Sequence, residues 1–192
     1  PASAALLVGS EEIISALFGY GSFSEKAVLN SAKALYYFGL GLPAFALIKV
    51  FSTFFFANND TKSPFYISLM SVILNICISL YYFSSIGFII IPIATSISSW
   101  FNSLVLFIHL RNRNLFYFNK VFMMKFFKIL LASIIIGLFF NYLTFFFEEQ
   151  LLYNNNFKSF YLILSVLLCL TLYLLISILI KAFNYKDLQL KY

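Results

Sequence analysis

The chain has 192 residues, of which 62% are hydrophobic and only 10% are charged, and its formal net charge is +6. Too little polar surface remains to coat a water-soluble domain of this size, so the composition excludes a soluble protein and indicates an integral membrane protein. The positive charge does not indicate a nucleic-acid partner, because the basic residues gather at turns between apolar stretches and form no basic, polar face.

Six apolar stretches approach or exceed the length of about 20 residues that a helix needs to cross a membrane. They predict an all-α, polytopic membrane protein with six transmembrane helices joined by short polar turns. The sequence begins at Pro1 and enters an apolar stretch at once, without a basic leader or a cleavage site. We therefore expect a fragment whose upstream half is missing.

The first helix is predicted over residues 1–18 and ends at the glycines of residues 19–21. Glu11 and Glu12 lie within a turn or two of that end. They can form an interfacial pair that reaches headgroups or water, or they can contact a substrate or a proton, and both interpretations stay open. Ser24 is an acceptable cap for the next helix.

The second helix is predicted over residues 24–56, which is longer than a bilayer requires. Gly39, Gly41 and Pro43 are the positions where it is expected to bend. Lys49 stands two turns before its far end. Its ammonium can extend toward that membrane surface, or it can enter a water-filled cavity and meet an anionic substrate or an acidic partner.

The third helix is expected to follow the polar turn of residues 57–63, with Ser63 as its cap and Pro64 at its first position. A tight turn at residues 84–87 separates it from the fourth helix, which has Pro92 near its start. These short connections predict that the two helices are antiparallel neighbours.

Polar side chains recur at spacings of three and four along both of these helices. The two stripes consist of Ser68, Ser71, Asn75 and Ser79 on the third helix and of Thr95, Ser98, Ser99 and Asn102 on the fourth. Such stripes can join helices through hydrogen bonds, or they can line a wet cavity or a small cation site. Asn75, Ser79 and Thr95 are the predicted ligands if a cation binds, because hard cations prefer oxygen.

The fifth and sixth helices are predicted over residues 121–147 and 159–182, with a polar loop between them. Asn141 is the polar residue that we single out in the middle of this helix pair. It can form a contact between helices, or it can have a functional role. Prolines and most glycines belong to the first four helices. We therefore divide the chain into residues 1–114, four helices of a bundle whose first helix is truncated, and residues 115–192, two further helices with a short tail.

Basic residues near the turns predict the orientation, because they are enriched on the cytoplasmic side. With the first helix running outward, the cytoplasmic set is Lys62, Arg111, Arg113, Lys120, Lys125, Lys128, Lys181, Lys186 and Lys191, and the external set is Lys26, Lys33 and Lys158. The C-terminus is then cytoplasmic, and the polar loop that starts at Glu148 is external.

No catalytic constellation, cofactor motif or metal-ligand cluster is visible in the sequence. The single histidine, His109, is expected at an interface, and Cys77 and Cys169 are expected to be small packing residues. We therefore expect neither an enzyme nor a cofactor. Interrupted helices, polar stripes and an intramembrane lysine favour transport over a structural subunit or an intramembrane enzyme.

Several longer segments resemble those of one transporter family. They are GLPAFALIKVF at residues 41–51, FANNDTKSP at residues 56–64, LFGYGSFS at residues 17–24, ILNICISL at residues 73–80 and IPIATSISSWFNSLVL at residues 91–106. Together they resemble the MurJ/MviN lipid II flippase family of the MOP superfamily, which has a D-T-[KR]-[ST]-P turn after a GLPAF helix. Ser79 departs from this family, whose members have an acidic residue there.

The resemblance implies a fourteen-helix transporter, of which this chain would supply the ninth to the fourteenth helix. It implies that the protein flips lipid II, the undecaprenyl-pyrophosphate-linked peptidoglycan precursor, across the bacterial cytoplasmic membrane by alternating access. Membrane lipids, a monovalent cation and the missing N-terminal half would be partners. Lys49, Pro43, Gly41 and Asn102 are the candidates for the substrate cavity. A polysaccharide-precursor flippase or a multidrug exporter of the same superfamily is the alternative.

Overall fold

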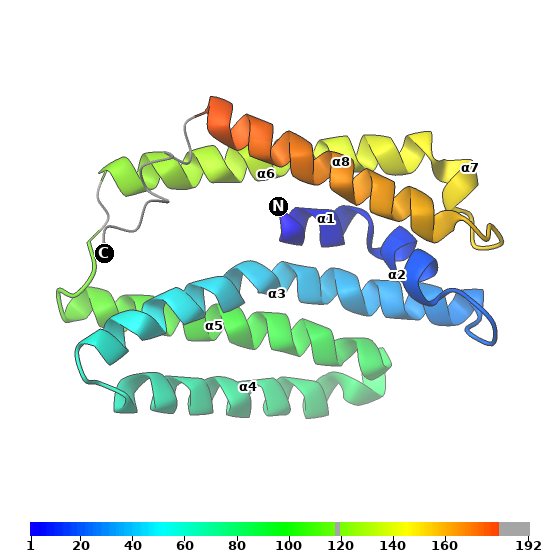
Figure 1. Cartoon of the computed structure of the whole chain (residues 1–192). Coiled ribbons are helices and arrows are strands. Elements are labelled where there is room, and N and C mark those ends of the chain that lie inside the picture. Colours follow the sequence, from blue (N-terminus) through cyan, green and yellow to red (C-terminus); the bar gives the residue numbers. More distant parts are fainter. Residues whose placement is uncertain (118–119, 181–192) are drawn as a thin grey trace. The chain divides into compact units, whose positions relative to one another are not determined.

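The computed structural model describes residues 1–117 and 120–180, and all its regular elements in these ranges are helices (Figure 1). The chain divides into two compact units, residues 1–32 with 118–192 and residues 33–117. The long helix α3 (Glu25–Ala57) begins in the first unit and continues into the second. The predicted boundary after residue 114 stays a prediction.

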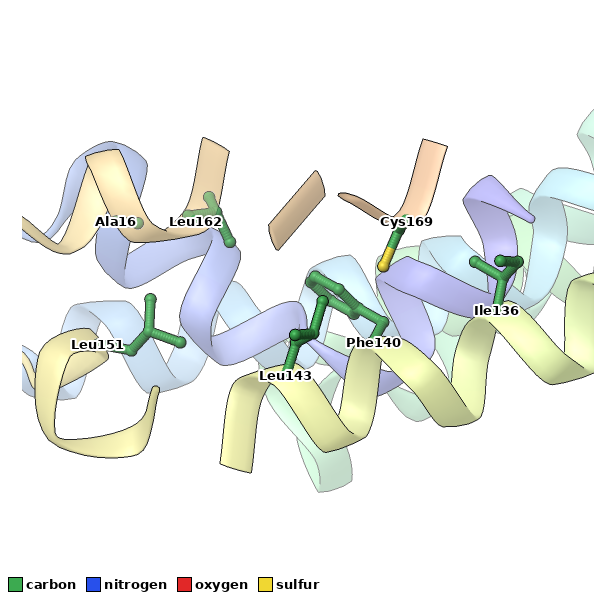
Figure 2. Packing of buried hydrophobic residues seen from close by; sticks show 7 residues of the cluster. All are labelled: Ala16, Ile136, Phe140, Leu143, Leu151, Leu162 and Cys169. Carbon is green, nitrogen blue, oxygen red and sulfur yellow. The ribbon is translucent and has the colours of Figure 1, made fainter. Parts of the chain in front are cut away.

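The first unit packs two short N-terminal helices against a long antiparallel pair. Besides the start of α3, its helices are α1 (Ala2–Val8), α2 (Ser10–Phe18), α6 (Lys120–Phe146), α7 (Glu148–Leu151) and α8 (Lys158–Leu179). Helix α1 contacts α6, and α2 contacts α8. Buried side chains from α2, α6, α7 and α8 form one core, in which α6 and α8 direct Phe140 and Cys169 toward each other (Figure 2).

The first predicted helix is broken, so the prediction of one continuous helix over residues 1–18 was wrong. It ends at Val8 and resumes at Ser10, with Gly9 between the two pieces. A Cβ atom at Gly9 would collide with the ring of Phe140 on α6, so only glycine allows this close approach. The pieces have 7 and 9 residues, so neither reaches the length of a membrane span.

The second unit consists of the rest of α3, α4 (Lys62–Ile86), a short 3-10 helix η1 (Gly87–Ile89) and α5 (Ile90–Asn112). Helices α4 and α5 lie side by side, which their short connection predicts (Figure 1). Gly87 has a φ of 75°, a conformation that favours glycine. Helix α3 lies within one residue of its predicted bounds and has Pro43 in its interior, and its ribbon changes direction near the middle (Figure 1).

The start of α4 differs from the prediction. The helix begins at Lys62, so Pro64 is its third residue, and Ser63 does not cap it. Instead, Ser63 donates two hydrogen bonds to the carboxylate of Asp60, from its backbone N (3.0 Å) and from its Oγ (2.6 Å). A carboxylate is the stronger cap here, because it also interacts favourably with the positive end of the helix dipole.

Four segments of the described residues are long and apolar enough to cross a membrane: Glu25–Ala57, Lys62–Asn112, Phe122–Phe146 and Lys158–Leu179. The second segment holds both α4, with 25 residues, and α5, with 23, so each of these helices can span by itself. The fold is therefore that of an all-α, polytopic membrane protein. The predicted end of the sixth helix, at residue 182, lies outside the described residues.

Candidate functional site

The polar stripes of α4 and α5 face each other, as their spacing predicts. We call this contact the α4–α5 seam and define it by its hydrogen-bonded side chains, Ser68, Ser71, Asn75, Thr95, Ser98 and Asn102. Ser71 Oγ donates to the carbonyl O of Ser98 (2.7 Å), and Asn75 Nδ2 donates to Thr95 Oγ1 (3.1 Å) and Ser98 Oγ (3.3 Å). Side-chain hydrogen bonds therefore join the two helices along the seam.

The three predicted cation ligands lie together at one part of this seam. Ser79 Oγ donates to Asn75 Oδ1 (3.5 Å), and Thr95 Oγ1 accepts from Asn75 while donating to the carbonyl O of Ile91 (2.8 Å). These contacts satisfy the oxygens within the protein and support the helix-joining interpretation. The described residues contain no group of three or more His, Cys, Asp or Glu placed to hold a metal ion.

Helix α5 also contacts the backbone of α3 where α3 carries its glycines. Trp100 Nε1 donates to the carbonyl O of Leu40 (3.0 Å), and Ser96 Oγ donates to the carbonyl O of Tyr37 (2.5 Å). A Cβ atom at Gly41 would lie 2.7 Å from Ser96 Oγ and 3.2 Å from its Cα. Gly41 therefore allows a close approach of the two helices that a larger residue would prevent.

The four predicted cavity residues are distributed over different environments. Gly41 is buried against α5, and Asn102 is buried in the α4–α5 seam, where its Nδ2 donates to Ser68 Oγ (3.4 Å). Asn102 Oδ1 is buried and has no hydrogen-bond partner among the described residues. Pro43 and Lys49 lie on the exposed surface of the chain. Gly41 on α3 and Asn102 on α5 thus both lie at helix contacts that involve α5, whereas Lys49 lies on the exposed surface of α3.

An ion pair explains the polar turn between α3 and α4. Arg113, which follows α5, pairs with Asp60 (Nη1 to Oδ2, 2.5 Å) and donates from Nη2 to Ser63 Oγ (3.3 Å). Hydrogen bonds from Ser63, together with Arg113, hold the pKa of Asp60 well below its ordinary value. The aspartate of the D-T-K-S-P sequence therefore accepts hydrogen bonds from the first turn of α4, and the aspartate and serine together join this turn to Arg113 at the end of α5.

Two asparagines end the neighbouring helices in the same way. Asn59 after α3 and Asn114 after α5 have φ angles of 57° and 56°. Around each, backbone hydrogen bonds close the pattern of a Schellman motif, Asp60 N to Phe55 O and Leu115 N to Leu110 O, both 3.0 Å. Asparagine is the residue besides glycine that adopts this conformation at a helix end.

Beneath this turn, Phe51, Phe55, Ile67, Leu106 and Leu110 form the apolar core of the second unit. The ring of His109 lies 5.7 Å from that of Phe55, and its Nε2 is buried without a hydrogen-bond partner among the described residues. The histidine is thus a packing residue at the end of α5.

The sequence prediction missed a buried lysine in the first unit. Lys158, which was expected in an external polar loop, begins α8 and is completely buried. Its Nζ donates to the carbonyl O of Gly19 (2.5 Å) and of Tyr153 (2.7 Å) and lies over the rings of Tyr20 (4.3 Å) and Tyr153 (4.6 Å). We call these four residues the Lys158 clamp. It ties the end of α2 to the start of α8.

Comparisons with known proteins point to one family. The family model described as "Lipid II flippase MurJ" matches residues 1–165. A probable lipid II flippase MurJ from Rhizobium meliloti is 43% identical over 107 residues, which cover 56% of this chain and 20% of that protein. One from Thermotoga maritima is 35% identical over 137 residues, which cover 71% of this chain and 27% of that protein.

A solved structure of lipid II flippase MurJ in an inward closed conformation is similar to this chain, with a TM-score of 0.75 and 28% sequence identity. The similarity covers 98% of this chain and 36% of that one. The chain therefore spans well under half the length of the relatives that it matches. The family match extends over most of the chain, including the α4–α5 seam, the Asp60–Arg113 ion pair and the residues that form the Lys158 clamp. The chain belongs to the lipid II flippase MurJ family.

Proposed function

We propose that this chain is the C-terminal part of a lipid II flippase in the bacterial inner membrane. The observation that carries the proposal is the family match over residues 1–165, supported by a similar solved structure of MurJ. In this proposal, the complete transporter moves the undecaprenyl-pyrophosphate-linked precursor from the inner to the outer leaflet. The chain supplies the ninth to the fourteenth helix of the transporter, the first of these as the broken pair α1 and α2, and its C-terminus is cytoplasmic.

The contact between α3 and α5 supports alternating access as the mechanism. Gly41 and Ser96 pack closely, and the polar groups there bond to backbone carbonyls, as at Tyr37. Domain closure by shear slides packed helices past each other, and small residues at a contact leave room for such sliding. We assign Gly41 and Pro43 to the part of α3 that bends during transport, with Asn102 lining the path on α5.

Lys49 is the residue that we assign to the substrate. It is exposed on α3 although its neighbours are apolar, and an ammonium is an apt partner for a pyrophosphate. Lys33 is an exposed lysine of the same helix and serves as its matched control. In the full-length flippase, Lys49→Met should reduce transport at least about tenfold, the equivalent of ~1.4 kcal/mol, whereas Lys33→Met should leave transport unchanged.

The measurement is the fraction of lipid II that becomes accessible to an external labelling reagent in cells that depend on this transporter. Depletion of the full-length protein should leave lipid II on the inner leaflet. External labelling that stays normal after depletion would reject the flippase assignment. Equal activity of the two lysine variants would reject only the role of Lys49.

A monovalent cation at Asn75, Ser79 and Thr95 is part of the proposal. The three side chains lie together, although they already bond to one another and to the backbone. A cation would have to replace some of these bonds, so its binding should loosen the α4–α5 seam. Titration of the full-length protein with sodium or potassium should then change its thermal stability, and Asn75→Ala should abolish the change.

A further inference from the structure

The first unit contains an acidic hollow that the proposed transport mechanism does not use. It consists of two adjoining cavities of ≈ 540 and ≈ 260 Å³ that share Glu12, Thr144 and Glu148 as lining residues. The walls come from α2, from the start of α3, from the end of α6 and from α7. All these elements belong to one compact unit, so the hollow is defined within it.

The charge of this hollow is negative. Four carboxylate side chains line it, those of Glu11, Glu12, Glu25 and Glu148, and no lysine, arginine or histidine is among its described lining residues. Lys158, whose ring partner Tyr153 is a lining residue, donates from its ammonium to two carbonyl oxygens in its own clamp. The walls therefore favour a cationic ligand.

Ser15 provides an independent sign that a ligand belongs there. It lines the smaller cavity, its side chain is only 5% exposed, and its Oγ has no hydrogen-bond partner among the described residues. Buried hydroxyls are nearly always hydrogen-bonded, because an unpaired one loses its water without replacement. A ligand with a hydrogen-bond donor would satisfy this oxygen.

The shape and lining of the hollow favour an organic cation over a bare metal ion. The described residues offer no group of three or more acidic or metal-ligating side chains placed to hold a metal. The hollow is also far larger than an ion, and aromatic residues, Tyr142 and Phe145, share its wall with the carboxylates. An ammonium group donates hydrogen bonds to carboxylates and hydroxyls and is attracted by aromatic faces.

Apolar side chains at the same hollow suit the rest of such a ligand. Leu138 and Leu152 line it and are 67% and 58% exposed, and the adjacent ring of Phe145 is 74% exposed. We propose that the hollow binds an organic ammonium group, with Glu12, Glu148 and Ser15 as its acceptors. The group can come from a lipid headgroup such as phosphatidylethanolamine or from a free amine. The inference does not depend on transport of lipid II.

The first experiment compares lipids in the full-length protein. The protein is placed in nanodiscs of phosphatidylethanolamine or of phosphatidylglycerol, which lacks the ammonium, and retained lipid is measured by native mass spectrometry. We expect at least about tenfold more retained phosphatidylethanolamine. A second measurement separates the two sources by testing whether Glu12 and Glu148 are protected from a carboxylate-modifying reagent. Protection only by ethanolamine, added to the phosphatidylglycerol sample, identifies a site for free amines. Protection only by phosphatidylethanolamine identifies a site for a lipid headgroup.

The second experiment uses matched glutamate variants. Glu12→Gln and Glu148→Gln should each lower retention about tenfold, and Ser15→Ala should lower it several-fold. Glu149→Gln is the control, because Glu149 is exposed next to Glu148 but does not line the hollow. Thermal stability in phosphatidylglycerol nanodiscs identifies any variant that fails to fold. The retention of phosphatidylethanolamine is then compared among the folded variants.

Three results would overturn the inference. The first is equal retention of the two lipids together with no protection by ethanolamine. The second is a loss in Glu149→Gln as large as that in Glu148→Gln. The third is protection of the carboxylates by magnesium but not by either ammonium compound, which would assign the hollow to a hydrated metal ion.

Discussion

Two helix pairs of this chain are joined by different chemistry. Helices α4 and α5 meet through hydroxyl and amide groups, whereas α6 and α8 meet through a core that includes Phe140, Leu162 and Cys169. In a membrane, apolar surface gains little by leaving lipid, so close packing holds the second pair and hydrogen bonds support the first. The α4–α5 seam is therefore held by several side-chain hydrogen bonds, whereas the α6–α8 core is held by the packing of buried side chains such as Phe140.

The largest effect is expected from a substitution that disrupts the core of the first unit. Phe140 is 1% exposed, and its ring packs against the break at Gly9. Phe140→Ala should lower the free energy of unfolding by about 3–5 kcal/mol, because it leaves a cavity that the helices cannot fill. Leu138→Ala, at an exposed position of the same helix, should change it by less than about 0.5 kcal/mol. Unfolding in mixed micelles measures both, and equal losses would contradict the core assignment.

The second effect tests the polar anchor of the same unit. Lys158→Met should cost about 1–3 kcal/mol, because the carbonyls of Gly19 and Tyr153 lose their charged donor while buried. Lys26→Met removes an exposed charge and should have little effect. The same unfolding experiment compares them. If Lys158→Met leaves the free energy of unfolding unchanged, these carbonyls have other partners.

The third effect is smaller and sharpens the description of the seam. Asn75→Ala and Thr95→Ala each remove one end of the same interhelical hydrogen bond. Their double-mutant cycle should give a coupling of about 0.6 kcal/mol, the typical value for such bonds in membranes. Asn75→Ala with Thr53→Ala serves as the uncoupled cycle, because the exposed Thr53 hydroxyl donates to the carbonyl O of Val50 in its own helix. A coupling that appears only in the presence of sodium or potassium would favour a cation site over direct bonding.

The smallest effect concerns pH. The pKa of Asp60 is lowered in the folded chain, first by its hydrogen bonds from Ser63 and then by Arg113. Its contribution to stability is therefore present above the ordinary carboxyl pKa of about 3.9 and is lost as pH falls toward the folded value. Between about pH 5 and pH 2, the melting temperature should fall more steeply for the wild type than for Asp60→Asn. Parallel curves would contradict a role for this carboxylate.

The bounds of the long helices could be predicted because local signals set them. Runs of apolar residues mark their interiors, and polar turns such as residues 57–63 mark their ends. The break at Gly9 could not be predicted, because its cause is the ring of Phe140, far along the chain. A glycine in an apolar run has no signal of its own that distinguishes a break from a continuous helix.

The candidate site was predictable only where side chains bond to side chains. The spacing of Asn75 and Thr95 placed them on facing stripes, and they do contact each other. Ser96 and Trp100 were missed because they donate to backbone carbonyls of α3. Every residue has a backbone carbonyl, so the sequence does not mark these partners. Lys158 was missed because its burial depends on Gly19 and Tyr20, which are distant in sequence. Its position beside polar loop residues suggested a solvated charge instead.

The Lys158 clamp also determines how the native protein reacts with chemical probes. An ammonium enclosed by two carbonyls and two rings cannot attack an acylating reagent, and its side chain cannot enter the specificity pocket of trypsin. Exposed lysines such as Lys33 have no such protection. Modification or cleavage at Lys158 in a footprinting experiment would therefore report the moment at which the first unit opens.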